Sequence, residues 1–318
     1  TGGELVTPSR VVVRGVTVNM DGVLSGATEM VVGLDASVNL GSSGGTSNLT
    51  SGRYTLEMLY VDGRALSDGA PSAILGVADG VTLDISSIHV VAGEVRPNGA
   101  LTVLSTLANI SVDGTITGKG RGYVKQSGPG WGGSSSSYYY TASASHGGAG
   151  GTVDVGAMYG STFEPVLPGS GGYAGAGGAA LRLDADTLIL DGTIDMDGAT
   201  TMGGAGAGGS VYITTRLLQG TAATAVIRAR GGDGTYSDSS RYSGGSNGGG
   251  GGRVALYCTE SVHSGNFSGF ANVPQIEAYG GADGGSTDRN GGAGTMYTEC
   301  GGGNRSLVLD GNGHGRTT

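Results

Sequence analysis

The chain has 318 residues, 69 of them glycine, with 14% charged residues and a formal net charge of −9 at pH 7. A glycine inside an α-helix costs about 1 kcal/mol relative to alanine. The longest glycine-free stretch, residues 100–113, has only 14 residues, so an α-helical domain is excluded. Low charge with 37% apolar residues argues against disorder. An acidic chain with two lysines does not predict a nucleic-acid partner, and no long apolar run predicts a membrane span.

The first part of the chain, residues 1–123, carries short alternating apolar runs such as 10–18 and 81–85. Alternation with a period of two predicts strands with one buried face. We interpret this region as tightly wound coils of a β-helix. A β-sandwich is the alternative, because isolated short strands are compatible with both folds.

The second part, residues 124–318, is richer in glycine and repeats a tract that leads into a short strand, at 150–155, 208–213 and 251–257. Strands this short cannot bury a core alone and must stack on copies of themselves. Glycine supplies positive φ at corners and lets neighbouring backbones approach closely. The pattern predicts an all-β fold, a parallel β-helix (solenoid) with short strands, glycine corners and long Gly/Ser/Tyr loops. Its expected length is on the order of 40–70 Å at the strand spacing of a sheet.

The run Gly-Gly-Gly-Gly-Gly-Arg-Val-Ala-Leu-Tyr at 248–257 resembles the glycine-rich β-helix repeats of large extracellular surface and filament proteins of protists, algae and some bacteria. The resemblance covers roughly residues 107–311, and the first hundred residues match loosely. It implies an extracellular structural or adhesive protein and brings no catalytic residues with it. We therefore expect a non-enzymatic segment of a longer secreted glycoprotein. It would form a filament, flagellar hair or wall element through self-association or with other extracellular structural proteins.

An aromatic loop favours a second function, a carbohydrate-binding adhesin. The loop holds Trp131 and the triplet Tyr138, Tyr139 and Tyr140 among glycines and serines. Exposed aromatic side chains stack on sugars or contact proteins. The alternative is that they fold down over a sheet face or a solenoid edge.

A third function, a polysaccharide lyase or hydrolase of β-helix type, rests on His314 between two glycines. This triplet resembles one motif of the pectin-hydrolysing β-helix family. The other motifs of that family are missing, so we expect no catalytic residue and no cofactor.

Carboxylates gather in one stretch, at Asp184, Asp186, Asp191, Asp195 and Asp197. Such a group can serve as an acid/base pair or a calcium site, or it can lie on the solvent face and the turns of consecutive coils. We favour the placement on the solvent face and in the turns. The run 231–236 resembles a calcium-binding nonapeptide but has Tyr236 in place of the required aspartate. We expect His89 to be an ordinary strand residue. Four scattered histidines and two cysteines predict no zinc site.

Four N-glycosylation sequons, at Asn48, Asn109, Asn266 and Asn304, favour a secreted protein. Asn48 is the strongest candidate because its surroundings are polar. Asn109 is the weakest, because Leu107 and Ile110 flank it in an apolar run.

The two cysteines, Cys258 and Cys300, each follow the last glycine of a tract by six positions and lie 42 residues apart. If this spacing is one coil, they are neighbours on adjacent strands, with Cα atoms about 4.8 Å apart. A disulfide accepts roughly 4.4–6.8 Å, whereas two coils would separate the Cα atoms by nearly 10 Å. The spacing predicts a disulfide, with two buried free thiols as the alternative.

Overall fold

The computed structural model describes most of the chain. The described residues are 5–6, 10–14, 17–20, 24–25, 29–33, 37–40, 52–63, 73–133, 142–151, 155–235, 247–260, 276–284, 289–301, 303–309 and 311. Every regular element of two or more residues in these ranges is a β-strand, and none is an α-helix. The predicted all-β class is therefore confirmed.

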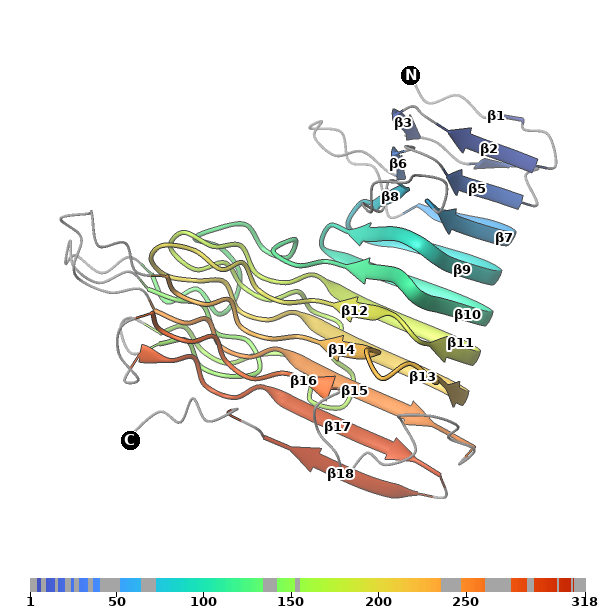
Figure 1. Cartoon of the computed structure of the whole chain (residues 1–318). Helices are drawn as coiled ribbons and strands as arrows, with labels where there is room; N and C mark the ends of the chain where they lie inside the picture. Colours follow the sequence, from blue (N-terminus) through green and yellow to red (C-terminus); the bar gives the residue numbers. More distant parts are fainter. Residues whose placement is uncertain are drawn as a thin grey trace.

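One series of parallel strands, which we call the first ladder, runs the length of the molecule (Figure 1). In spatial order it contains β2 (Arg10–Arg14), β5 (Glu29–Gly33), β7 (Arg53–Asp62), β9 (Val81–Pro97), β10 (Ala100–Thr117), β11 (Ala180–Leu190), β13 (Ser210–Gln219), β15 (Arg253–Cys258) and β17 (Thr295–Cys300). The last member, β18 (Asn304–Val308), pairs antiparallel with β17. The spatial order follows the chain order, so each strand lies on its predecessor in the series.

A second ladder of shorter parallel strands accompanies the first. It contains β3 (Thr17–Met20), β6 (Ser37–Leu40), β8 (Ile74–Val77), the later parts of β9 and β10, β12 (Thr193–Asp195), β14 (Val226–Arg228) and β16 (Ile276–Glu277). Because β9 and β10 belong to both ladders, the two join into one sheet of 16 strands. A separate two-stranded sheet pairs β1 (Leu5–Val6) with β4 (Leu24–Ser25).

The strands β9 and β10 pass from one ladder to the other through a bend at two paired glycines, Gly93 and Gly114. A Cβ at Gly114 would lie 2.0 Å from the carbonyl oxygen of Val90, closer than any real Cβ contact. The register also shifts between Ile110 and Asp113, which marks a bulge at the bend. Glycine is therefore needed here because two backbones meet, and not because of a positive φ.

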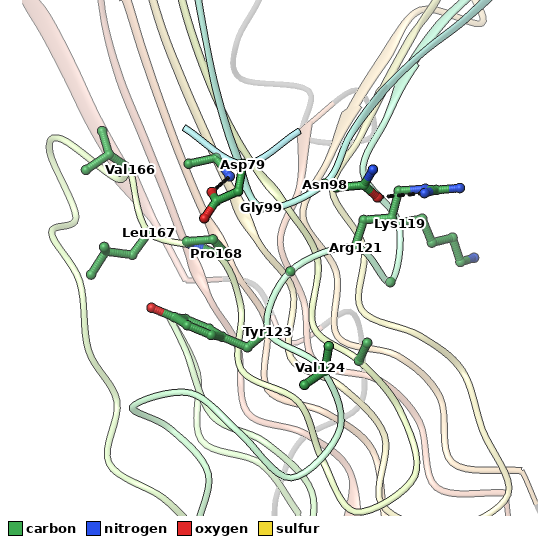
Figure 2. Close-up of a pocket in the computed structure, with 14 residues that line it drawn as sticks. Asp79, Asn98, Gly99, Lys119, Arg121, Tyr123, Val124, Val166, Leu167 and Pro168 are labelled. Carbon is green, nitrogen blue, oxygen red and sulfur yellow. Dashed lines mark hydrogen bonds between the residues drawn. The ribbon is translucent and has the colours of Figure 1, made fainter. Parts of the chain in front are cut away.

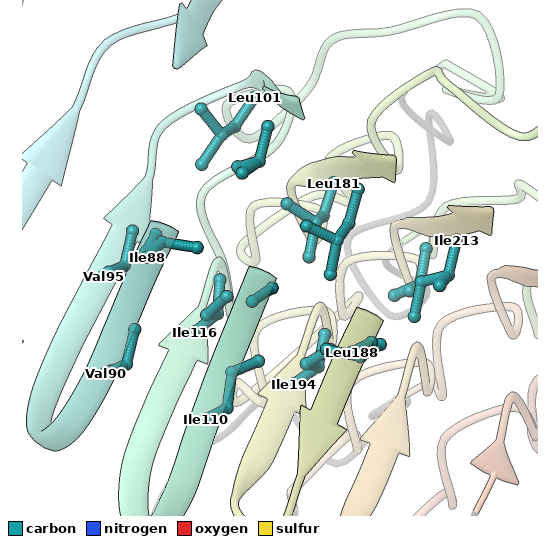
Figure 3. Close-up of a cluster of buried hydrophobic side chains, with 14 of the residues drawn as sticks. Ile88, Val90, Val95, Leu101, Ile110, Ile116, Leu181, Leu188, Ile194 and Ile213 are labelled. Carbon is teal, nitrogen blue, oxygen red and sulfur yellow. The ribbon is translucent and has the colours of Figure 1, made fainter. Parts of the chain in front are cut away.

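The core lies between the two ladders and consists of alternate side chains of each strand, which are buried while their neighbours face outward. Figure 3 shows this cluster, which includes Ile88, Val90, Val95, Leu101, Ile110, Ile116, Leu181, Leu188, Ile194 and Ile213. Equivalent positions in successive strands carry residues of similar size, as in the paired Val103, Leu183 and Ile213. Burial of each such side chain stabilises the fold by roughly 1.5–3 kcal/mol. The core is continuous from Met30 to Met296.

The glycine-rich segments form a packed layer beside β11–β17, where the sequence predicts corners and loops (Figure 1). We call it the glycine layer; its described segments are 118–122, 142–151, 169–178, 197–209, 229–234, 247–252, 278–284 and 291–294. Their backbones hydrogen-bond from segment to segment. The N–H of Gly178 donates to Ala207 O (2.9 Å), that of Gly208 to Gly250 O (2.9 Å), and that of Gly251 to Gly292 O (2.9 Å).

A second set of backbone hydrogen bonds connects further pairs of segments within the glycine layer. The N–H of Gly249 donates to Gly232 O (2.9 Å), that of Gly281 to Gly249 O (2.8 Å), and that of Gly291 to Gly281 O (2.8 Å). At most of the glycines in these segments, an added Cβ would meet the backbone of a neighbouring segment. The glycine tracts are thus structural elements whose composition is set by close backbone approach.

Candidate functional site

The predicted disulfide is confirmed. Cys258 and Cys300 are direct partners on the adjacent parallel strands β15 and β17, and both are buried. Their sulfurs are bonded and their Cα atoms lie 4.3 Å apart. The alternative of two free thiols is wrong. A cross-link between strands 42 residues apart fixes the register of two consecutive layers of the sheet.

Two of the four sequons fall in the described residues. Asn109 lies in β10 between the buried Ala108 and Ile110, and its own side chain is half-buried on the outward face. Alternation along the strand places Asn109 on the outward face together with Leu107, whereas Ile110 points into the core. Asn304 opens β18 and is exposed. Asn48 and Asn266 lie outside the described residues.

The aromatic loop is described only at its beginning. The Trp131 side chain is half-buried, and the backbone N–H of Trp131 donates to the carbonyl oxygen of Gly128 (3.1 Å). Tyr138, Tyr139 and Tyr140 lie outside the described residues, as do His314 and Tyr236. His89 is a half-buried residue of β9 whose ring stacks on Tyr60 at 4.7 Å, as expected of a strand residue.

The clustered aspartates do not converge on one point. Arg182 contacts Asp184 at 2.8 Å, and Arg216 contacts Asp186 at 2.8 Å. Asp191 accepts the backbone N–H groups of Thr221 (2.5 Å) and Ala222 (2.9 Å). Asp195 accepts the N–H of Asp197 at 2.9 Å. Within the described part of the chain no group of three His, Cys, Asp or Glu residues is placed to hold a metal ion.

Asp197 is the one buried member of this set, and Arg230 of the next layer neutralises it. The guanidinium donates to Asp197 Oδ2 at 2.6 Å and to the hydroxyl of Tyr279 at 2.9 Å, and the Arg230 N–H donates to Asp197 Oδ1 at 2.7 Å. Burial alone would lower the pKa of Arg230, but the hydrogen bond to Asp197 raises it above its ordinary value. The pair joins the segments that follow β12 and β14 and has the features of a structural contact.

A second buried polar group surrounds His146 of the glycine layer. His146 Nδ1 lies 2.7 Å from the carbonyl oxygen of Gly208 and donates to it, while Nε2 has no partner among the described residues. The ring packs on Tyr159 at 4.6 Å. Burial lowers the pKa of His146 to about 4, so the imidazole is neutral at pH 7. Because it is fully buried, the ring has no route to a substrate.

Residues 155–168, which we call the strap, cross the outward face of β13, β15 and β17. Arg253 Nε donates to the carbonyl oxygen of Tyr159 (2.9 Å), and the hydroxyl of Tyr257 donates to the carbonyl oxygen of Phe163 (2.9 Å). Phe163 also packs edge-on against Tyr297 at 4.9 Å. The strap thus covers outward aromatic residues of the sheet. Apolar side chains of the strap remain exposed in turn, at Met158, Phe163, Val166 and Leu167.

An open groove of about 800 Å³ lies where the end of the strap meets the turns that follow β8, β9 and β10 (Figure 2). Its side-chain lining comprises Asp79, Asn98, Lys119, Arg121, Tyr123, Val124, Val166, Leu167 and Pro168. In Figure 2, Asp79, Leu167 and Pro168 lie on one side of the groove, Asn98, Lys119 and Arg121 on the other, and Tyr123 between them. Sequence reasoning did not identify this site, because its residues are far apart along the chain. The one available signal was that both lysines of the chain fall at 119 and 125.

Comparison with known proteins adds no homology: no family model, no curated protein and no solved structure matches the chain. The described residues contain no helix that is both long and apolar enough to cross a membrane.

Proposed function

We propose that the chain is a rigid β-solenoid segment of an extracellular structural protein, in which each coil contributes one strand to each ladder. The observation that carries this proposal is the pairing pattern. Apart from the antiparallel β18, successive strands of both ladders pair in parallel and in chain order, and β9 and β10 belong to both. A chain that winds around a common core produces this pattern. A sandwich of antiparallel sheets does not.

Two further features favour a mechanical role. The disulfide ties β15 to β17, and the glycine layer adds inter-segment backbone hydrogen bonds alongside the strands. These bonds link the segments of successive layers to one another, as a rigid rod requires. A disulfide of this kind also fits an oxidising, extracellular compartment.

An exposed surface for association is present at the last strand of the sheet. The strand β18 is exposed along Asn304, Arg305, Ser306 and Leu307, and no described strand pairs with its second edge. Free strand edges and exposed apolar patches are the features that pair with further chains. Self-association, or association with other extracellular structural proteins, follows from the proposal.

Electron microscopy of the purified chain and of the native material tests this function. The proposal predicts short rods from the purified chain and the same rods, joined end to end or side by side, in filaments or wall layers of the native material. Compact particles without a long axis, or rods that occur only as isolated molecules in the native source, would contradict it.

A further inference from the structure

Three of the 17 basic residues of this acidic chain lie at or near the groove: Lys119 and Arg121 line it, and Lys125 follows them in the chain outside the lining. The two lysines of the chain, Lys119 and Lys125, flank Arg121 and Tyr123, and no acidic residue occurs in the sequence between Asp113 and Asp154. Lys119 and Lys125 are exposed, and Arg121 is half-buried. In a chain with net charge −9, three cations within seven residues form a local patch of opposite sign. Such a patch attracts anionic ligands that the rest of the surface repels.

The groove holds its polar groups in fixed positions. Asp79 Oδ1 accepts the N–H of Ala100 at 2.7 Å, next to Gly99, whose φ of 86° shapes the turn. The second oxygen of Asp79 accepts no hydrogen bond from a described residue. Across the groove, Arg121 Nη1 donates to Asn98 Oδ1 at 2.7 Å, and this bond orients the guanidinium. The groove therefore offers two cationic side chains on one side and, on the other, one carboxylate oxygen that accepts no hydrogen bond from the described part of the chain (Figure 2).

The groove also has an apolar and aromatic surface. The ring of Tyr123 is half-buried, and Val166, Leu167 and Pro168 of the strap form the adjacent wall. A concave surface that is mostly apolar with a few convergent polar groups is the usual composition of a ligand site, and about 800 Å³ is within the usual volume. An aromatic ring at such a surface packs against the apolar face of a sugar ring.

We propose that this groove binds an anionic polysaccharide, a chain of carboxylated sugars. Its hydroxyl groups would donate to Asp79, its carboxylates would accept from Lys119 and Arg121, and a sugar ring would pack on Tyr123. A peptide of aspartate and glutamate supplies the carboxylates, but it has no side-chain hydroxyl for Asp79 and no ring to pack on Tyr123. The site goes beyond the structural role proposed above, since it would hold the rod to the acidic polysaccharide of a wall or matrix.

The test is a binding titration of the folded, oxidised chain with hexagalacturonate at about 50 mM and 300 mM salt, with maltohexaose as the neutral probe. Binding of hexagalacturonate should weaken at least several-fold at the higher salt, because screening shortens the reach of the cations. Maltohexaose should bind at least ten-fold more weakly than hexagalacturonate at the lower salt.

Variants separate the groove from the rest of the surface. The double variant Lys119→Ala/Lys125→Ala should weaken hexagalacturonate binding about ten-fold, and Tyr123→Ala should weaken it by a similar factor. Arg53→Ala, which removes an exposed cation from β7, is the control and should bind like the parent chain. Both lysines are exposed, so their removal should leave the unfolding midpoint unchanged. Equal binding of the two sugars, no binding at millimolar concentration, or an unaffected double variant would overturn the proposal. Rods in the electron microscope do not depend on these results, so the two proposals fail separately.

Discussion

Alanine substitution at two neighbouring glycines, Gly291 and Gly292, tests the packing of the glycine layer. A Cβ at Gly291 would lie 1.9 Å from the carbonyl oxygen of Gly249, whereas a Cβ at Gly292 would lie 3.2 Å from the nearest atom, the nitrogen of Ala149. Neither glycine has a positive φ. The two substitutions therefore change the unfolded chain in the same way and differ only in the space available in the folded chain.

The expected cost follows from how firmly Gly249 is held. Its N–H donates to Gly232 O, and its carbonyl accepts the N–H of Gly281, so it cannot move aside without loss of backbone bonds. Overpacking costs about 1–3 kcal/mol, and each lost hydrogen bond adds about 1 kcal/mol. The reduced entropy of the unfolded chain returns about 0.4–1 kcal/mol. We expect Gly291→Ala to lower the free energy of unfolding by about 3 kcal/mol and Gly292→Ala to change it by less than about 1 kcal/mol.

Urea denaturation followed by the fluorescence of Trp131, the single tryptophan, and by circular dichroism measures both variants. Coincident transitions by the two probes are the condition for comparing free energies. If Gly291→Ala and Gly292→Ala unfold at the same urea concentration, the close backbone approach in the glycine layer is not what requires glycine, and the reasoning fails.

Three further outcomes are expected in the same assay. Replacement of both Cys258 and Cys300 by serine should lower the free energy of unfolding by about 4 kcal/mol, the chain-entropy value for a loop of 42 residues. A decrease below about 1 kcal/mol would show that the disulfide does not restrain the unfolded chain. Arg230→Ala should cost about 2–3 kcal/mol because it leaves a buried carboxylate unpaired, whereas Arg216→Ala, which breaks an exposed pair, should leave the midpoint nearly unchanged; equal effects would contradict the assigned burial. The pKa of His146 is about 4 in the folded chain and 6.5 in the unfolded chain. Between these pH values the unfolded chain therefore binds more protons than the folded chain. The free energy of unfolding should fall by up to about 3 kcal/mol as the pH drops from 6.5 to 4. His146→Gln should remove this part of the pH dependence, and an unchanged pH profile would refute a buried neutral histidine.

The strands and the disulfide are predictable from the sequence because their signals are local or periodic. Alternating apolar residues mark β9, β10 and β11, and equal spacing from two glycine tracts places Cys258 opposite Cys300. The same alternation, applied to Asn109, would have turned its side chain outward. Its ranking below Asn48 stays a prediction, because Asn48 lies outside the described residues.

The glycine layer and the groove are not predictable in the same way. Glycine has no side chain and so carries no periodic pattern of burial, and the tracts looked like corners and loops although many of their backbones pack on several sides. The groove brings together Asp79, Arg121 and Leu167, which are separated by tens of residues along the chain. Asp197 likewise meets its partner Arg230 only because successive layers stack in register.

Distances between spin labels on outward positions of the first ladder test the stacking of one strand per coil most directly. Thr55 of β7, Thr214 of β13 and Glu299 of β17 occupy equivalent positions along the ladder. At about 4.8 Å per strand, Thr55 and Thr214 are separated by roughly 19 Å, and Thr55 and Glu299 by roughly 29 Å. Pulsed electron paramagnetic resonance on the two doubly labelled chains should give a second distance about 10 Å longer than the first. Equal distances, or a second distance shorter than the first, would contradict a rod built by regular stacking of coils.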